Sequence, residues 1–217
     1  MTPMLNRQLK AFICYRLNAF SLIELSIVLV IVGVLMGAIF KGQDLLDVAK
    51  IRSVVNDFQH IKVAIHNYQD TYGTLPGDDL SAATRFGTGV TNGNGNGIIE
   101  SNESANVWIH LNKAGDWETS TPPVSKFGGN YDIISLTDPA MPGNWIRLSK
   151  DSGNALLTPK QVQKLMSKID EGQSSSDATQ GLLRAKEGQG VASGQCTNGG
   201  NLNLEIKNPT CVVYMKL

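Results

Sequence analysis

The feature that most constrains this chain is an almost uninterrupted apolar run near its N-terminus, over residues 25–40. Sixteen residues in a helix span roughly 24 Å, a little short of the roughly 30 Å hydrocarbon core of a bilayer. Adding residues 20–23 reaches the required length but places Glu24 inside the apolar phase, where an unpaired carboxylate is costly. Residues 1–19 carry three basic residues and no acidic one, which favours a cytoplasmic position for this end. We therefore expect residues 20–40 to span a membrane once, and Glu24 to have a cationic partner.

Three kinds of N-terminal segment have such a run: a secretory signal, a plain membrane anchor and a prepilin. A secretory signal is cleaved after the run at an Ala-x-Ala site, but Lys41-Gly42-Gln43 follows here. A plain anchor has little reason to keep Glu24. The sequence Ala19-Phe20-Ser21-Leu22-Ile23-Glu24 resembles the prepilin peptidase site of type IV pilins and type II secretion pseudopilins.

This resemblance implies a leader peptide of residues 1–19, cleavage between Ala19 and Phe20, and N-methylation of Phe20. The family nearly always has Gly at the position of Ala19, so we expect slower processing here. Cleavage would create an ammonium group on Phe20, which Glu24 of a neighbouring subunit could neutralise within an apolar filament core. Two charges that are each costly alone become tolerable as a pair. The alternative is that Glu24 only reaches toward the membrane interface.

Beyond the apolar run the pattern becomes amphipathic. Apolar residues recur at steps of three and four, which indicates one face of a helix, and Gly73-Thr74-Leu75-Pro76-Gly77 ends it. One helix over residues 20–72 would be roughly 80 Å long. Such a length suits a stalk whose second half is covered by a globular head, residues 73–217. The predicted apolar stripe is Leu45, Val48, Ile51, Val55, Phe58, Ile61, Ile65, Tyr68 and Tyr72.

The head is predicted to be small and mixed in structure. One helix is expected over residues 104–114, and another begins at Thr158, where Thr-Pro-x-Gln combines an N-cap, a first-turn proline and a capping box. Short strands with turn residues between them indicate a small antiparallel sheet across the stalk. The expected fold class is α+β and, by the resemblance, type IV pilin-like: a long N-terminal helix packed against this sheet. The predicted strands are residues 131–136, 145–148, 182–186, 202–206 and 211–215.

Cysteine placement indicates a disulfide in the head. Cys14 lies in the leader, so Cys196 and Cys211 remain after its removal, in a segment expected to lie outside the cytoplasm. A bridge between them would close a loop of about 15 residues and stabilise the head by on the order of 3 kcal/mol. Its position resembles the C-terminal disulfide loop of type IV pilins. The alternative is a pair of reduced thiols.

Residues Asn92–Glu103 match the twelve-position pattern of a calcium-binding loop. Asn92 stands where the pattern has Asp, so Glu100 and Glu103 are the only anions, which implies weak affinity and suits a site outside the cell. The alternative is an Asn-Gly turn that binds no ion. The predicted ligands are Asn92, Asn94, Asn96, the carbonyl oxygen of Ile98, Glu100 and Glu103.

Charge and motifs argue against an enzyme or a nucleic-acid-binding protein. After residues 1–19 the chain has 16 basic and 19 acidic residues, which gives no basic surface for nucleic acid. The sequence has no nucleophile elbow, His-Glu-x-x-His motif or phosphate-binding glycine loop. We expect His110 to be a surface or capping residue and Asp78-Asp79 to lie in a turn. A membrane-anchored or secreted hydrolase is the rival class, because isolated acids and one His could still form a site.

The resemblance implies a structural subunit of a type IV pilus-like filament, with a type II secretion pseudopilin as the alternative. The implied partners are prepilin peptidase, further copies of the chain or related pilins, the inner-membrane assembly platform and membrane lipid. The chain would lie in the inner membrane as a single pass with its N-terminus cytoplasmic, and later in an extracellular pilus or periplasmic pseudopilus. No cofactor is expected besides the possible Ca²⁺.

Overall fold

The computed structural model describes residues 21–170 and 176–217. The predicted leader and the Ala19–Phe20 bond lie outside these residues. The chain divides into two compact units, Met1–Asp44 and Leu45–Leu217, and the boundary falls within the long helix α1. The elements are α1 (Leu22–Tyr72), α2 (Ala82–Phe86), α3 (Ser104–Ala114), β1 (Asn130–Leu136), β2 (Gly143–Ser149), α4 (Pro159–Ile169), β3 (Leu183–Glu187), β4 (Thr197–Asn198), β5 (Asn201–Leu202) and β6 (Cys211–Lys216).

The described part of the first unit is almost entirely the start of α1. Its large apolar side chains are exposed, from 43% at Val32 to 89% at Leu22. By its length and composition this helix could cross a membrane. An apolar surface of this kind requires lipid or another protein to cover it.

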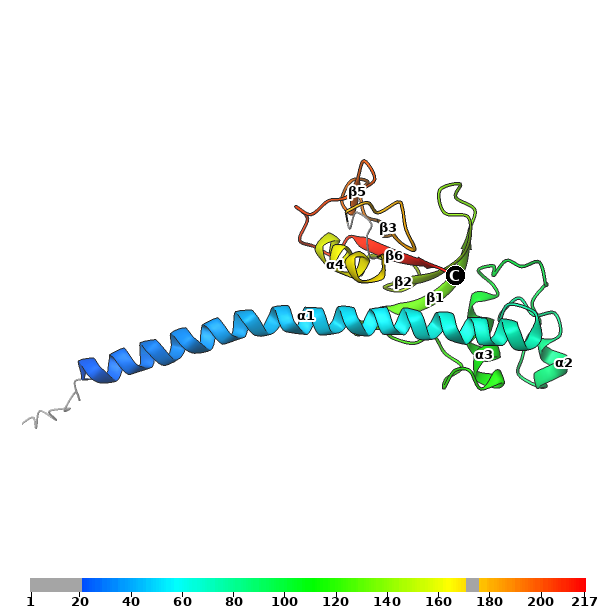
Figure 1. Ribbon diagram of the computed structural model, residues 1–217, viewed down its shortest axis with the longest axis horizontal. Coiled ribbons are helices and arrows are strands. Elements are labelled where there is room, and N and C mark those ends of the chain that lie inside the picture. The colour runs from blue at the N-terminus through cyan, green and yellow to red at the C-terminus, as the bar shows by residue number, and fades with distance from the viewer. Residues whose placement is uncertain (1–20, 171–175) are drawn as a thin grey trace, which may run out of the picture. The chain divides into compact units, whose positions relative to one another are not determined.

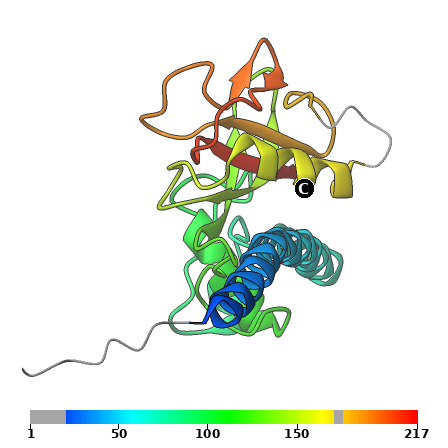
Figure 2. The same ribbon diagram turned by 90° about the vertical axis from the view of Figure 1, so that its left-hand side faces the viewer.

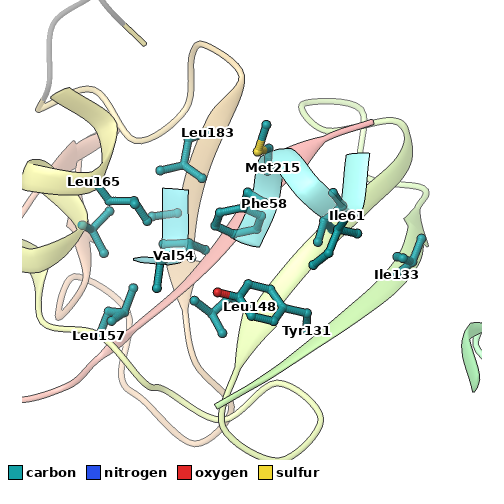
Figure 3. Packing of buried hydrophobic residues seen from close by; sticks show 14 of the residues in the cluster. Val54, Phe58, Ile61, Tyr131, Ile133, Leu148, Leu157, Leu165, Leu183 and Met215 are labelled. Atoms are coloured by element: carbon teal, nitrogen blue, oxygen red, sulfur yellow. The ribbon is translucent and has the colours of Figure 1, made fainter. Parts of the chain in front are cut away.

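The second unit is built around the remainder of α1 and an antiparallel sheet with strand order β1-β2-β6-β3. In this unit the sheet and α4 lie on one side of α1 (Figures 1 and 2). Tyr131 is paired with Leu148, and both side chains lie on the sheet face that contributes to the core. Val54, Phe58 and Ile61 of α1 fill the same core (Figure 3). The rings of Phe58 and Tyr131 meet edge to face, 5.4 Å apart. The predicted α+β class, a long helix against an antiparallel sheet, is confirmed.

The buried face of α1 differs from the predicted stripe at its start. The predicted stripe includes Leu45, which is 71% exposed, and omits Val54, which is fully buried. Ile51, Val54 and Phe58 follow the three-and-four spacing of a helix face. The buried stripe therefore begins at Ile51, the first residue of α1 that packs into the core formed with the sheet and α4.

Local sequence signals predicted α4 correctly. The hydroxyl of Thr158 accepts a hydrogen bond from the Gln161 N–H at 3.3 Å, and the Gln161 side chain accepts one from the Thr158 N–H at 3.0 Å. Pro159 occupies the first helical position. The capping box and the proline thus fix where this helix begins.

The prediction of a strand over residues 202–206 is wrong. Only Asn201–Leu202 pair, with Thr197–Asn198, in a two-residue hairpin. Gly199 and Gly200 form its turn with φ values of 58° and 86°, a left-handed conformation that glycine adopts without strain. After Leu202 the chain turns, and the Ile206 N–H donates to the Asn203 carbonyl oxygen at 3.2 Å, so residues 203–206 do not extend the strand.

Cys196 and Cys211 form the predicted disulfide, with sulfurs 2.01 Å apart and both residues fully buried. The bond joins the residue before β4 to the first residue of β6, a central strand of the sheet.

Replacing both Cys196 and Cys211 by serine should lower the free energy of unfolding by about 3 kcal/mol, because the unfolded chain gains loop freedom. Urea unfolding of the purified variant under identical conditions measures this loss. An unchanged urea midpoint would show that the disulfide does not contribute to the stability of the head.

Candidate functional site: the start of α1 and the loops at its end

Glu24 lies in the first turn of α1 with its side chain exposed. Its carboxylate accepts a hydrogen bond from the Ser21 N–H at 3.3 Å. This is one half of the capping box that Ser21-x-x-Glu24 encodes, and a negative charge is also favourable at this end of a helix. None of the ion pairs among the described residues involves Glu24. The assembly role of Glu24, with a cationic partner on another copy, stays a prediction.

A buried carboxylate, Asp79, ties the loop that follows α1 to the end of that helix. Asp79 accepts hydrogen bonds from the Tyr68 hydroxyl at 2.6 Å and from the Ser81 N–H at 2.8 Å, and forms an ion pair with Arg85. The Arg85 guanidinium also lies over the Tyr72 ring, 4.4 Å from its centroid. Burial acts to raise the pKa of Asp79, but these hydrogen bonds and the Arg85 charge outweigh it and hold the pKa below its usual range. The ionised carboxylate anchors α2 against α1.

His110 is fully buried, which corrects the expectation of a surface or capping residue. Its Nδ1 accepts a hydrogen bond from the Gly77 N–H at 2.9 Å, and its Nε2 lies 2.9 Å from the Thr91 carbonyl oxygen. The ring therefore carries its proton on Nε2 and is neutral. Burial lowers the pKa of His110, although the Thr91 carbonyl acts to raise it. With both ring nitrogens bonded to the backbone, His110 joins two loops and is not free to act as a catalyst.

Acid should weaken the head through His110. The unfolded chain takes up a proton near the ordinary pKa of 6.5, whereas the folded ring resists protonation, so its stabilising contribution is complete above that pH and is lost as pH falls. We expect the melting temperature to fall more between about pH 7 and pH 5 in the wild type than in His110→Gln.

The exposed His60 and His66 provide the control for this effect. The double variant His60→Gln/His66→Gln should keep the wild-type pH dependence. An identical pH slope in His110→Gln would show that another group is responsible.

A second buried carboxylate, Asp78, lies inside the Asn-Gly loop. One oxygen accepts hydrogen bonds from the N–H groups of Gly95 at 2.7 Å and Asn96 at 3.1 Å, and the other accepts from Gly97 at 2.7 Å. Gly93 packs directly against the backbone of Asp78, so any side chain at that position would collide with it. Asp78 is thus the centre around which residues 93–97 fold, and the sequence motif alone did not reveal it.

The predicted calcium ligands are only partly brought together. Glu103 is buried and accepts hydrogen bonds from the N–H groups of Asn94 at 3.0 Å and Glu100 at 3.1 Å. Asn92 instead faces α2, where its side-chain oxygen accepts from the Ala83 N–H at 2.7 Å. The loop is therefore held by hydrogen bonds within the protein, with Asn92 directed away from its centre.

Asp78 supplies the carboxylate that the loop lacks at its first position. It accepts from the N–H groups at positions four, five and six of the loop, counted from Asn92. Within the described part of the chain no group of three or more His, Cys, Asp or Glu side chains is placed to hold a metal ion. Glu100 is exposed and accepts a hydrogen bond from the Asn96 side-chain amide at 3.4 Å. A calcium ion would need Asn94, Asn96, the Ile98 carbonyl and Glu100 in addition to Asp78 and Glu103. Calcium binding by this loop stays a prediction.

Comparison with known proteins bears on the N-terminal segment. Residues 16–40 match the family model described as the prokaryotic N-terminal methylation motif, and the match includes Ala19, Phe20 and Glu24. A search of curated proteins found no match. The chain is similar to the solved structure of the major type IV pilin PilA1 from Clostridium difficile, with 19% identity and a TM-score of 0.41, over 78% of this chain and 95% of that chain.

Proposed function

We propose that this type IV pilin-like chain, which carries the N-terminal methylation motif, is the structural subunit of a type IV pilus-like filament. The observation that carries the proposal is the position of the motif. It covers the start of α1, an exposed apolar helix of sufficient length to cross a membrane, and the same helix continues as the central core element of the second unit. A motif of this kind points to a structural subunit and not to an enzyme.

The N-terminal segment would act in two stages. Before assembly, the apolar start of α1 resides in the inner membrane with the basic leader in the cytoplasm. Prepilin peptidase then cuts between Ala19 and Phe20, and the new ammonium of Phe20 pairs with Glu24 of a neighbouring copy as α1 leaves the lipid. Burying the two charges costs about as much free energy as their attraction returns, so the pair adds little net stability. Because each charge is costly without its partner, the pair instead fixes the axial register of the subunits.

Surface labelling tests this function. An antibody against the head should decorate sheared filaments of the wild type by immunogold electron microscopy, and deletion of the pilus assembly ATPase should remove them. A chain that stays dispersed in the inner membrane in every strain would contradict the proposal.

The same experiment separates a surface pilus from a type II secretion pseudopilus. In the pseudopilus case, labelled filaments would depend on the secretion ATPase and secretion would fail without this chain. The Cys196–Cys211 disulfide favours the surface pilus, because its position resembles the C-terminal disulfide loop of type IV pilins.

A further inference from the structure

A row of three lysines on α4 has no partner among the described residues. Lys160, Lys164 and Lys168 are all exposed, recur at the four-residue spacing that places them on one face, and belong to none of the ion pairs. Like charges at this spacing repel one another along a helix. Lys160 also lies in the first turn, where a cation opposes the helix dipole. Lys168 lies in the last turn, where the dipole favours a cation, so only part of the row opposes the helix, and α4 is held by its capping box and buried apolar face.

A groove of about 750 Å³ lies between α1 and the loop of residues 116–124. Val63 of α1 and Val124 of the loop line it and are 56% and 65% exposed. Asp116 and Glu118 lie on the same wall, and neither carboxylate takes part in the ion pairs of the described residues. The groove thus combines exposed apolar side chains with two unpaired negative charges.

We propose that α4 of one copy docks through its lysine row into the Asp116–Glu118 groove of a second copy. The proposal rests on the filament function and names the contact between heads. Two consecutive lysines of the row, four residues apart, are separated along the helix axis by about 6 Å. Asp116 and Glu118, two residues apart, are separated by at most about 7 Å. Two of the three lysines can therefore meet both carboxylates at once.

The remaining surface of the groove suits lysine as well. A lysine side chain carries an aliphatic stem that can cover apolar surface while its ammonium reaches a carboxylate. Val63 and Val124 offer that apolar surface beside the two acids. Both halves of the contact are present on this chain, which makes a second copy the partner indicated by charge.

A repeating contact requires the lysine row and the Asp116–Glu118 groove to be accessible to different neighbours. In Figure 1, α4 lies above the Leu45–Tyr72 part of α1, whereas α3, which leads into residues 116–124, crosses α1 and extends below it. One copy can therefore present α4 to a second copy and receive α4 of a third. A contact between two different patches of identical subunits repeats without closing and builds an open filament.

Charge reversal in the full chain, expressed in cells, tests the contact. Lys160→Glu/Lys164→Glu/Lys168→Glu and Asp116→Lys/Glu118→Lys should each lower filament yield by on the order of tenfold, because like charges would then face each other. Combining the two sets should restore the yield to within about twofold of the wild type, because the pairs are re-formed with opposite polarity. Reversal of the exposed lysines Lys126, Lys150 and Lys207 gives the same change of net charge and should have no effect.

Cross-linking gives a readout that does not depend on filaments. Mature chains carrying Lys164→Cys and Glu118→Cys should form cross-linked dimers and ladders in intact membranes, whereas Lys207→Cys with Glu118→Cys should not. Formation of the Cys196–Cys211 disulfide in every variant confirms that the head has folded.

The outcomes separate the two proposals. Filaments that tolerate both charge reversals, with no cross-link, would overturn the head contact and leave the filament function standing. Cross-links in a chain that never forms filaments would support the contact and count against the function. Loss of filaments on reversing the lysines but not the acids would assign the row to another anion, such as lipid phosphate, and overturn the proposal.

Discussion

Glu24→Gln is expected to abolish filament assembly while leaving cleavage of the leader intact. The ammonium created on Phe20 would enter the apolar filament core without a counter-charge, and removing one partner of a buried ion pair is strongly destabilising. Filament yield in the sheared fraction should fall by on the order of a hundredfold or more, whereas the mass of the membrane-bound chain should still show removal of residues 1–19. Glu24→Val should behave in the same way.

Glutamine is the informative replacement because Glu24 also accepts a hydrogen bond from the Ser21 N–H. A glutamine oxygen can make the same capping contact, so Glu24→Gln removes the charge and keeps the cap. Gly42→Ala provides a control that leaves the charge in place in the same helix, at a site with open space around it. Normal filament yield in Glu24→Gln would show that the residue acts only as a cap or only reaches the membrane interface.

Asp78→Ala is expected to give a large loss of head stability. It removes the acceptor of three backbone N–H groups in residues 95–97. The Gly97 N–H would be left unpaired, whereas the N–H groups of Gly95 and Asn96 would keep only the neutral Asp78 carbonyl and Asn94 amide oxygens, each at 3.0 Å. Because hydrogen bonds to a charged group contribute more than neutral ones, the loss should be about 3 kcal/mol or more, measured as a lower urea midpoint of the purified chain. Leu80→Ala, at an exposed side chain next to the same loop, is the matched control and should cost far less. Equal midpoints for wild type and Asp78→Ala would show that the loop is not organised around this carboxylate.

The same unfolding series tests the calcium prediction. If the loop binds calcium, the ion should raise the midpoint of the wild type and leave that of Asp78→Ala unchanged. Glu103→Ala should lower the midpoint with calcium and with chelator alike, because Glu103 accepts hydrogen bonds from Asn94 and Glu100 without an ion. Identical wild-type midpoints with calcium and with chelator would show that the loop binds no calcium. The role of Asp78 in organising the loop through hydrogen bonds would be unaffected.

Much of the fold could be predicted because its signals are local. The apolar run, the three-and-four spacing beyond it and the stop at Gly73 together define α1. Thr158 and Gln161 define the start of α4 through contacts three residues apart. Alternation and turn residues located four of the five predicted strands, all of them in the main sheet.

The features that were missed depend on contacts between distant residues. His110 bonds to Gly77 and Thr91, 33 and 19 positions away, so its burial follows from how the loops meet and not from its neighbours. Asp78 likewise reaches residues 17 to 19 positions further along the chain. Leu45 satisfied the helical spacing but lies before the point where the sheet and α4 begin to cover α1. Periodicity indicates which face of a helix is apolar, but it does not show where along the helix a partner begins.

The most direct test of the account is the mass of the chain as it exists in the cell envelope. We predict a mature polypeptide that begins at Phe20, with a methyl group on its α-amine and residues 1–19 removed. Intact-mass and peptide mass spectrometry of the native protein measure both. A chain recovered from assembled filaments with residues 1–19 still attached, or one that begins near residue 40, would contradict the central claim that a new N-terminal amine pairs with Glu24.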